Sequence, residues 1–185
     1  MRRGSVRRAG VVLGASAVLM LSFLPSGKAV DSPCTIKGTP GDDTIRGTPG
    51  PDQICGFGGN DIIRGLAGAD GIQGGAGGDL IVGGRRNDGL FGGSGRDRLE
   101  GRAGFDFIEG DAGADAELGG RGEDFIQDIH GRDVLNGGMG DDACLNIGDG
   151  SGGDQIFGGA GRDTFFADDH DTVVAAEHEE FCAAE

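Results

Sequence analysis

A nine-residue repeat runs through most of this sequence of 185 residues and limits the folds that the chain can adopt. Residues 38–145 divide into twelve consecutive rows of nine, and residues 149–166 supply two further rows. Residues 146–148 separate the two sets as an insertion. Self-similarity at a fixed short period is typical of a solenoid, in which each repeat packs only on its neighbours.

The sixth column of the repeat is aspartate in all fourteen rows. The first and fourth columns are mostly glycine, and the eighth is Ile, Leu or Phe in twelve rows. Low-complexity disorder would give a similar composition, but no reason for fourteen of the 23 aspartates to share one column. These aspartates are Asp43, Asp52, Asp61, Asp70, Asp79, Asp88, Asp97, Asp106, Asp115, Asp124, Asp133, Asp142, Asp154 and Asp163.

Each column has a structural demand. The glycines allow the positive φ angles of a tight six-residue turn, and the last three residues of a row then form a short strand whose middle side chain points inward. Alternate rows face opposite ways, so two consecutive rows close one coil. The pattern predicts two parallel sheets, with a rise of about 4.8 Å per coil and twelve apolar side chains between them.

Stacking also places the carboxylate of one row over that of the row two later, and this repulsion requires a cation between them. Turn carbonyls and carboxylates are hard oxygen ligands, which suit calcium with its six to eight ligands better than magnesium or a transition metal. The sequence therefore predicts calcium sites along the stacked aspartates.

Three rows follow the pattern GGxGxDxUx throughout: residues 74–82 (GGAGGDLIV), 92–100 (GGSGRDRLE) and 158–166 (GGAGRDTFF). In this pattern the chain resembles the RTX, or hemolysin-type, calcium-binding nonapeptide repeats. The resemblance covers residues 38–166 and implies an all-β fold, a right-handed parallel β-roll with two nonapeptides per coil. It also implies that turn carbonyls and sixth-column aspartates of rows n and n+2 hold the calcium ions.

Carried onto this sequence, the resemblance implies metal ligands on two edges of the roll. One edge would carry Asp43, Asp61, Asp79, Asp97, Asp115 and Asp133. The other would carry Asp52, Asp70, Asp88, Asp106, Asp124 and Asp142. These twelve rows form ten stacked pairs, so we expect about ten calcium ions, and Asp154 and Asp163 are further candidate ligands in the last two rows.

Residues 1–29 have the organisation of a secretory signal peptide: a basic start from Arg2 to Arg8, an apolar run at 11–24, and a small polar stretch ending at Ala29. The apolar run is shorter than the roughly 20 residues that a bilayer span needs, so a retained membrane anchor is the weaker alternative. We expect a secreted, extracellular protein without a membrane span after cleavage.

Cleavage after Ala29 would leave 31 acidic and 11 basic residues, a net charge of −20. Such a charge argues against nucleic acid and anionic membranes as partners and favours metal cations or basic surfaces. Ten divalent ions would balance it.

Four cysteines, Cys34, Cys55, Cys144 and Cys182, allow three pairings into two disulfides in an exported protein. Proximity in the sequence favours Cys34 with Cys55 and Cys144 with Cys182, while free thiols remain an alternative. No Cys-x-x-Cys occurs, which argues against a zinc site.

Both ends of the solenoid need caps, because an open sheet edge promotes aggregation. Residues 30–37 fit an N-terminal cap with a strand at 35–37, and residues 167–185 fit a C-terminal cap in which 171–173 repeats the Asp-x-apolar spacing. The insertion at 146–148 should form a bulge that shifts the last coil.

Three departures from the repeat predict weak points. Arg86 replaces a turn glycine, although the adjacent Asn87 tolerates a left-handed conformation. Glu117 stands where a core residue belongs, and Asp128 replaces an opening glycine. We therefore expect weaker binding and local disorder at about 110–136, and the strongest sites between 56 and 100.

The sequence indicates no catalytic site. His130, His170 and His178 lack the spacing of a zinc peptidase, and Ser94 and Ser151 have no nearby histidine in the sequence to activate them. With eight residues between the expected cleavage site and the first row, we expect no enzymatic or toxin domain ahead of the repeats.

We expect a secreted, monomeric, non-catalytic calcium-binding protein that folds when calcium binds. An alternative is an adhesion or cell-surface module in which calcium only stiffens the scaffold. Its partner face would include outward aromatic residues, namely Phe91, Phe107, Phe125, Phe157 and Phe166. An ice-binding solenoid is disfavoured, because no column shows a regular array of threonines.

Overall fold

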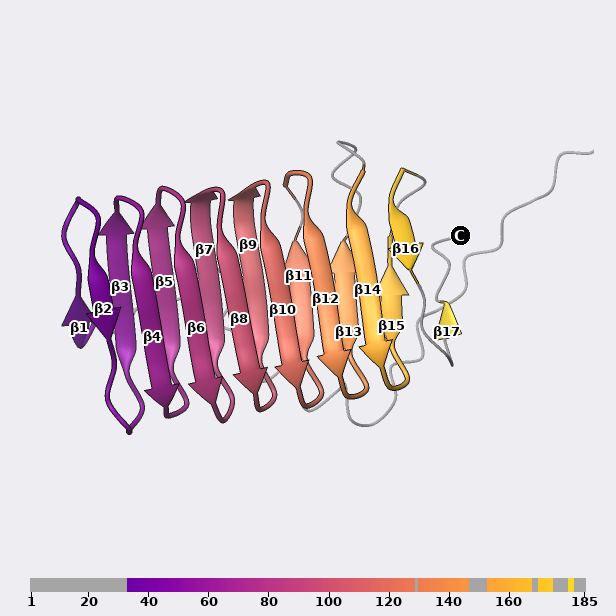
Figure 1. Cartoon of the computed structure of the whole chain (residues 1–185), viewed down its shortest axis with the longest axis horizontal. Coiled ribbons are helices and arrows are strands. Elements are labelled where there is room, and N and C mark those ends of the chain that lie inside the picture. The colour runs from indigo at the N-terminus through magenta and orange to yellow at the C-terminus, as the bar shows by residue number, and fades with distance from the viewer. Residues whose placement is uncertain (1–32, 129, 147–152, 168–169, 175–179, 182–185) are drawn as a thin grey trace, which may run out of the picture. The chain divides into compact units, whose positions relative to one another are not determined.

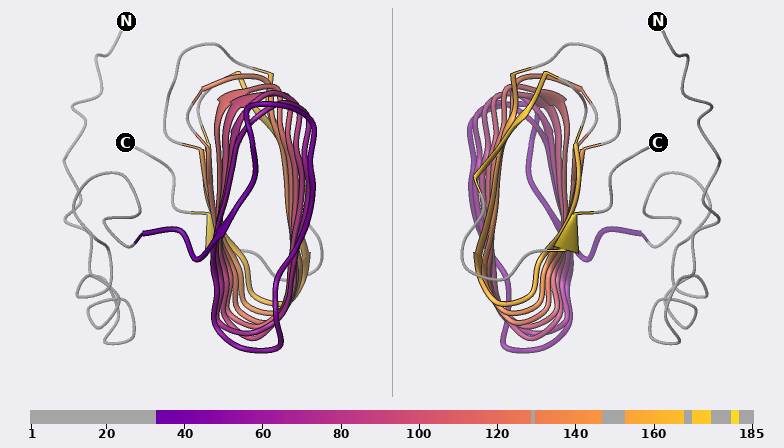
Figure 2. Two further views of the ribbon diagram at one scale, coloured as in Figure 1. Left: turned by 90° about the vertical axis from the view of Figure 1, so that its left-hand side faces the viewer. Right: turned by 90° about the vertical axis from the view of Figure 1, so that its right-hand side faces the viewer.

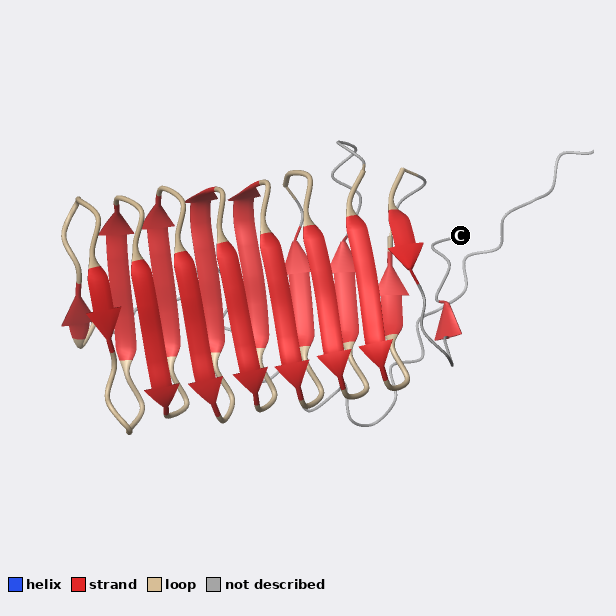
Figure 3. Cartoon of the chain, viewed as in Figure 1, coloured by secondary structure: helices blue, strands red, loops and turns tan. Residues whose placement is uncertain are grey.

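The computed structural model describes residues 33–128, 130–146, 153–167, 170–174 and 180–181. Every regular element in these residues is a β-strand (Figure 3). Within the same residues there is no helix long and apolar enough to cross a bilayer. The expected signal peptide at residues 1–29 lies outside the described residues.

The described strands alternate between two parallel sheets as the chain winds along the roll (Figure 1). One sheet has nine strands: β1 (Ile36–Lys37), β3 (Gln53–Gly58), β5 (Gly71–Ala76), β7 (Gly89–Gly95), β9 (Phe107–Gly113), β11 (Phe125–Asp128), β13 (Ala143–Asn146), β15 (Thr164–Phe166) and β17 (Glu180–Phe181). The other has eight: β2 (Thr44–Arg46), β4 (Ile62–Ala67), β6 (Leu80–Arg85), β8 (Arg98–Ala103), β10 (Ala116–Arg121), β12 (Val134–Met139), β14 (Gln155–Ala160) and β16 (Thr172–Val174).

Strand partners ahead of the insertion lie two rows apart in the repeat, as in the pairing of Ile63 with Ile81. Viewed along the roll, successive coils superimpose as flattened loops, each closed by two strands and two turns (Figure 2). The all-β parallel roll with two nonapeptides per coil, predicted from the repeat, is therefore confirmed.

The core is a double column of side chains from the eighth column of the repeat, placed between the sheets. Its members are Ile45, Ile54, Ile63, Ile72, Ile81, Leu90, Leu99, Ile108, Ile126, Leu135, Ile156 and Phe165. These are the twelve apolar residues predicted to point inward. Because neighbours in the sequence point outward, each row contributes one side chain to the core.

Most strands are longer than the three residues that the sequence predicted. In β4 and β6, Arg64 pairs with Val82, the pairing skips Gly65 and Gly83, and Leu66 then pairs with Gly84. The chain thus bends at the opening glycine, and the residues of the second and third columns then pair again with the neighbouring strand. The turn itself is shorter than the expected six residues.

Arg86 adopts the left-handed conformation itself, with a φ of 77°. Asn87, which the sequence offered as a residue that tolerates this conformation, does not adopt it. The Oδ1 of Asn87 instead accepts a hydrogen bond from the backbone N–H of Phe105, in the next coil, at 3.1 Å. The stacking of the coils imposes the turn geometry. Arg86 therefore adopts the left-handed conformation, which is sterically easier for glycine.

The N-terminal strand β1 pairs with β3, and a disulfide joins Cys34 to Cys55, as predicted. The proposed pairing of Cys144 with Cys182 lies outside the described side chains. The insertion is absorbed within one coil, because Val134 pairs with Gln155, and this offset exceeds two rows by the length of the insertion. Within the expected C-terminal cap, the segment that repeats the Asp-x-apolar spacing leads into the strand β16 (Thr172–Val174).

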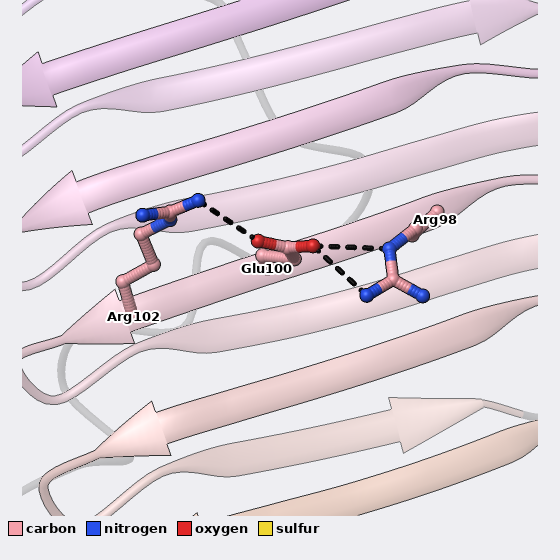
Figure 4. Close-up of polar contacts among 3 residues, drawn as sticks. All are labelled: Arg98, Glu100 and Arg102. Atoms are coloured by element: carbon pink, nitrogen blue, oxygen red, sulfur yellow. Dashed lines mark hydrogen bonds and ion pairs between the residues drawn. The ribbon is translucent and has the colours of Figure 1, made fainter.

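Charged side chains of the seventh and ninth columns lie on the outer faces. On β8, Glu100 lies between Arg98 and Arg102, at 3.0 Å and 3.2 Å from their guanidinium nitrogens (Figure 4). Both arginines are well exposed, so these ion pairs add little to stability. The outer faces can therefore vary in sequence without disturbing the coil.

Two adjacent isoleucines test the assignment of the core. Ile63 is fully buried, whereas Ile62 on the outer face is 37% exposed. Ile63→Ala should lower the free energy of unfolding by about 2–5 kcal/mol, since it removes buried methylenes and leaves a cavity. Ile62→Ala should cost about 1 kcal/mol or less. Urea unfolding followed by circular dichroism measures both, and equal losses would contradict the assignment.

Candidate metal centre

The sixth-column aspartates lie in two rows, one at each place where the chain turns between the sheets. We call these rows the first rim and the second rim. The first rim lies in the turns that lead into the eight-stranded sheet, at the upper ends of the strands in Figure 1: Asp43, Asp61, Asp79, Asp97, Asp115, Asp133 and Asp154. The second rim lies in the turns that lead into the nine-stranded sheet: Asp52, Asp70, Asp88, Asp106, Asp124, Asp142 and Asp163.

Each carboxylate from Asp61 to Asp163 accepts a hydrogen bond from the backbone of the coil before it. The N–H of Asp61, for example, donates to Oδ1 of Asp79 at 2.8 Å. The same bond recurs along both rims with N–O distances of 2.6–3.0 Å. The sequence predicted the stacking but not this bond, which holds one carboxylate oxygen of each aspartate from Asp61 to Asp163.

The second oxygen, Oδ2, is buried along most of both rims and accepts no hydrogen bond from any residue that the structure describes. This holds for Asp61, Asp70, Asp79, Asp88, Asp97, Asp106, Asp115, Asp124 and Asp142. A buried carboxylate oxygen without a donor is costly, so its repetition at nine positions indicates a series of ligand-binding positions.

The opening glycines leave room around these oxygens. A Cβ added to Gly92 would lie 2.6 Å from both Oδ2 of Asp97 and the carbonyl oxygen of Gly110 in the next coil. A Cβ on Gly119 would lie 2.5 Å from both Oδ2 of Asp124 and the carbonyl oxygen of Gly137. No side chain fits there, so a carboxylate oxygen and a carbonyl oxygen lie against the same glycine. We call each stacked pair of rim aspartates, two rows apart in the repeat, a rung.

Carboxylate and carbonyl oxygens in a buried, anionic space are the ligands of a hard divalent cation. They suit calcium, whose flexible shell of six to eight oxygens tolerates ligands from several turns, and they offer none of the nitrogen or sulfur preferred by zinc or copper. The donor set therefore fits the calcium that the repeat pattern implied.

The first coil differs from the others. Oδ2 of Asp43 accepts hydrogen bonds from the N–H of Thr39, at 2.5 Å, and from its hydroxyl, at 2.9 Å. Oδ2 of Asp52 is bonded in the same way to Thr48, at 2.6 Å and 3.0 Å. The Oδ2 atoms of these two aspartates are less available to a cation than those farther along the rims.

Burial shifts the pKa of several rim carboxyls upward. It raises the pKa of Asp88, Asp106, Asp115 and Asp142 to about 7 and that of Asp97 to about 6, although the hydrogen bond to Oδ1 partly lowers each. Neighbouring carboxylates add to the rise, as Asp70 and Asp106 do for Asp88. Without a cation, protonation of these buried carboxyls therefore stabilises the folded chain.

Two buried carboxylates outside the aspartate column lie beside the first rim. Glu117 and Asp128 were treated in the sequence only as defects of the repeat, but their side chains are buried close to Asp115 and Asp133. Their rows are two apart in the repeat and therefore lie in stacked coils, and this is the signal that could have brought the two residues together.

The comparisons with known proteins agree with this geometry. The family model of the RTX calcium-binding nonapeptide repeat matches residues 37–72, 56–90, 73–108, 91–126, 119–144 and 149–175. No curated protein matches the chain. The matched segments contain every aspartate of the two rims.

The pKa shifts predict an unusual response of the metal-free chain to pH. Burial raises the folded-state pKa of Asp88, Asp106, Asp115 and Asp142 to about 7, above the ordinary value of 3.8 that applies in the unfolded chain. Stability is thus greatest below about pH 4 and falls as the pH rises through 6 to 7. In chelator-treated protein, circular dichroism should show β-structure lost between about pH 5 and pH 8.

With calcium present the trend should reverse, because protons compete with the ion for the same oxygens. A metal-free chain whose β-signal stays constant or increases over this pH range would contradict the assignment of buried, unbridged carboxyls.

Proposed function

The chain belongs to the RTX calcium-binding nonapeptide repeat family, and on that footing we propose that it is a secreted calcium-binding protein whose β-roll folds as it binds several calcium ions. The proposed role is binding, without a catalytic step. Secretion rests on the basic and apolar organisation of residues 1–29.

One observation supports the proposal most strongly. Nine buried Oδ2 atoms accept no hydrogen bond from the described residues, and they recur once per rung on both rims. Protonation would relieve the repulsion between carboxylates, but only as the pH falls below about 7, the raised pKa of Asp88 and Asp106. A divalent cation at each rung provides both the charge and the coordination that they lack.

We propose that the ligands are the fourteen sixth-column aspartates together with turn carbonyl oxygens. Asp43 and Asp52 are the weakest of them, because Thr39 and Thr48 already bond to their Oδ2 atoms. The ten stacked pairs between residues 38 and 145 correspond to about ten ions, whose charge would balance the −20 of a chain cleaved after Ala29. Each bound ion stabilises only the folded form, so many weak sites together act as a folding switch.

A second candidate function is a calcium-stiffened adhesion module. The rings of Phe91, Phe107 and Phe125 lie in a row on the nine-stranded sheet, with centroids 5.6 Å and 5.5 Å apart. Such a row of aromatic side chains could contact an extracellular partner. Pull-down of extracellular partners with and without calcium separates this function from calcium binding alone.

A calcium titration tests the proposal directly. The chelator-stripped chain should be mostly unfolded at neutral pH and gain β-structure near extracellular calcium, roughly 10⁻⁴ to 10⁻³ M. Circular dichroism follows the folding, and calorimetry counts the ions. Identical spectra and unfolding temperatures with EGTA and with calcium would refute the proposed function.

Two adjacent acids provide a matched pair of variants. Asp124→Asn removes a buried rim charge, whereas Glu123→Gln removes an exposed charge from the same turn. Asp124→Asn should reduce the number of bound ions by one or two and raise the calcium concentration needed for folding, because Asp124 borders two rungs. Glu123→Gln should leave both quantities close to wild type, and an equal effect of the two variants would contradict the proposed ligands.

A further inference from the structure

Glu117 occupies a core position of the eight-stranded sheet. It pairs with Leu99 in β8 and with Leu135 in β12, so a carboxylate interrupts a column of apolar side chains. Its side chain is 2% exposed, and no amide or cationic donor of the described residues reaches its oxygens, which face the carboxyl of Asp128. A carboxylate at this place is costly unless another group compensates it.

Asp128 brings a second carboxylate to the same place. It ends β11, one coil after Gly110, and it is fully buried. A Cβ on Gly110 would lie within 2.8 Å of three oxygens: Oδ2 of Asp128, Oε1 of Glu117 and Oδ2 of Asp115. Three carboxylates from two successive coils therefore converge on the space beside a single glycine.

The first rim supplies the fourth carboxylate. The N–H of Asp115 donates to Oδ1 of Asp133 at 2.8 Å, as on every regular rung. One oxygen each from Asp115, Asp128 and Asp133 lie within 4.8 Å of one another. A regular rung has two aspartates, whereas this rung has two aspartates and two further buried carboxylates.

Four buried carboxyls this close cannot all be ionised without a counter-charge. Burial raises the pKa of Glu117 well above its ordinary value, and the adjacent Asp128 adds to the shift. Burial likewise raises the pKa of Asp115 to about 7, with contributions from Asp128, Asp97 and Asp133. Two arrangements would relieve the charge: a cation among the four carboxylates, or a proton shared between Glu117 and Asp128.

We propose that Asp115, Glu117, Asp128 and Asp133 form an interior calcium site that is the tightest of the roll. The inference rests on the proposed function, and it reverses the expectation of weaker binding at residues 110–136. The affinity of oxygen-ligand sites for calcium rises with the number of charged ligands and with their rigidity. This rung has four carboxylates, whereas a regular rung has two. It is also more rigid, because Glu117 is fixed between the sheets.

Two substitutions that restore the repeat test the site without disturbing the fold. Glu117→Leu places a leucine between Leu99 and Leu135, and Asp128→Gly restores the glycine of the first column. The full chelator-stripped chain is titrated with calcium against a competing chromophoric chelator at pH 7.5. Wild type should show one tightest site, and each variant should lose it, with the first-ion affinity lowered by about 10- to 100-fold.

Glu100→Gln is the matched control, because it removes one charge from the outer face of the adjacent strand β8. It should leave the first-ion affinity as in wild type. If wild type binds calcium but both restoring variants keep its first-ion affinity, the inference is overturned, and Glu117 and Asp128 form a proton-sharing pair. If wild type binds no calcium, the proposed function fails as well, so the two failures are distinguishable.

Discussion

The burial of one aspartate carboxylate at every turn is the constraint on which the rest of this structure depends. Oδ1 bonds to the backbone of the preceding coil and thereby fixes the spacing of the coils, while Oδ2 is left among buried oxygens. The bond orders the turns, but the buried charge opposes the ordered state. Such a fold can be stable only when its carboxylates are protonated or bridged by a cation. Folding therefore depends on the pH and on the cations in solution.

Glycine makes the arrangement geometrically possible. Beside Gly92 and Gly119, carboxylate and carbonyl oxygens from two coils lie where a Cβ would otherwise be. At its edges the chain therefore has oxygens in place of packed side chains. Its apolar core receives only one side chain per row. Compared with a globular domain of similar length, much more of its cohesion has to come from the edges.

The repeat was sufficient to predict the coil length, the inward column and the two rims, because a nine-residue period with one invariant column leaves one way to stack. The strand lengths and the left-handed Arg86 were not predictable from single rows, since the neighbouring coils impose them. The convergence of Glu117 and Asp128 was also missed. Each residue departs from the pattern of its own row, and only the two-row offset, which stacks one row on the other, shows that the two side chains meet.

The rim hydrogen bonds have a direction. Every donor belongs to the earlier coil and every acceptor to the later one, as with Asp61 and Asp79. The first coil, in contrast, has a disulfide and its own threonine donors. The two ends of the roll are consequently unlike. The N-terminal coil holds its own carboxylates, whereas each carboxylate from Asp61 to Asp163 depends on a backbone donor of the coil before it.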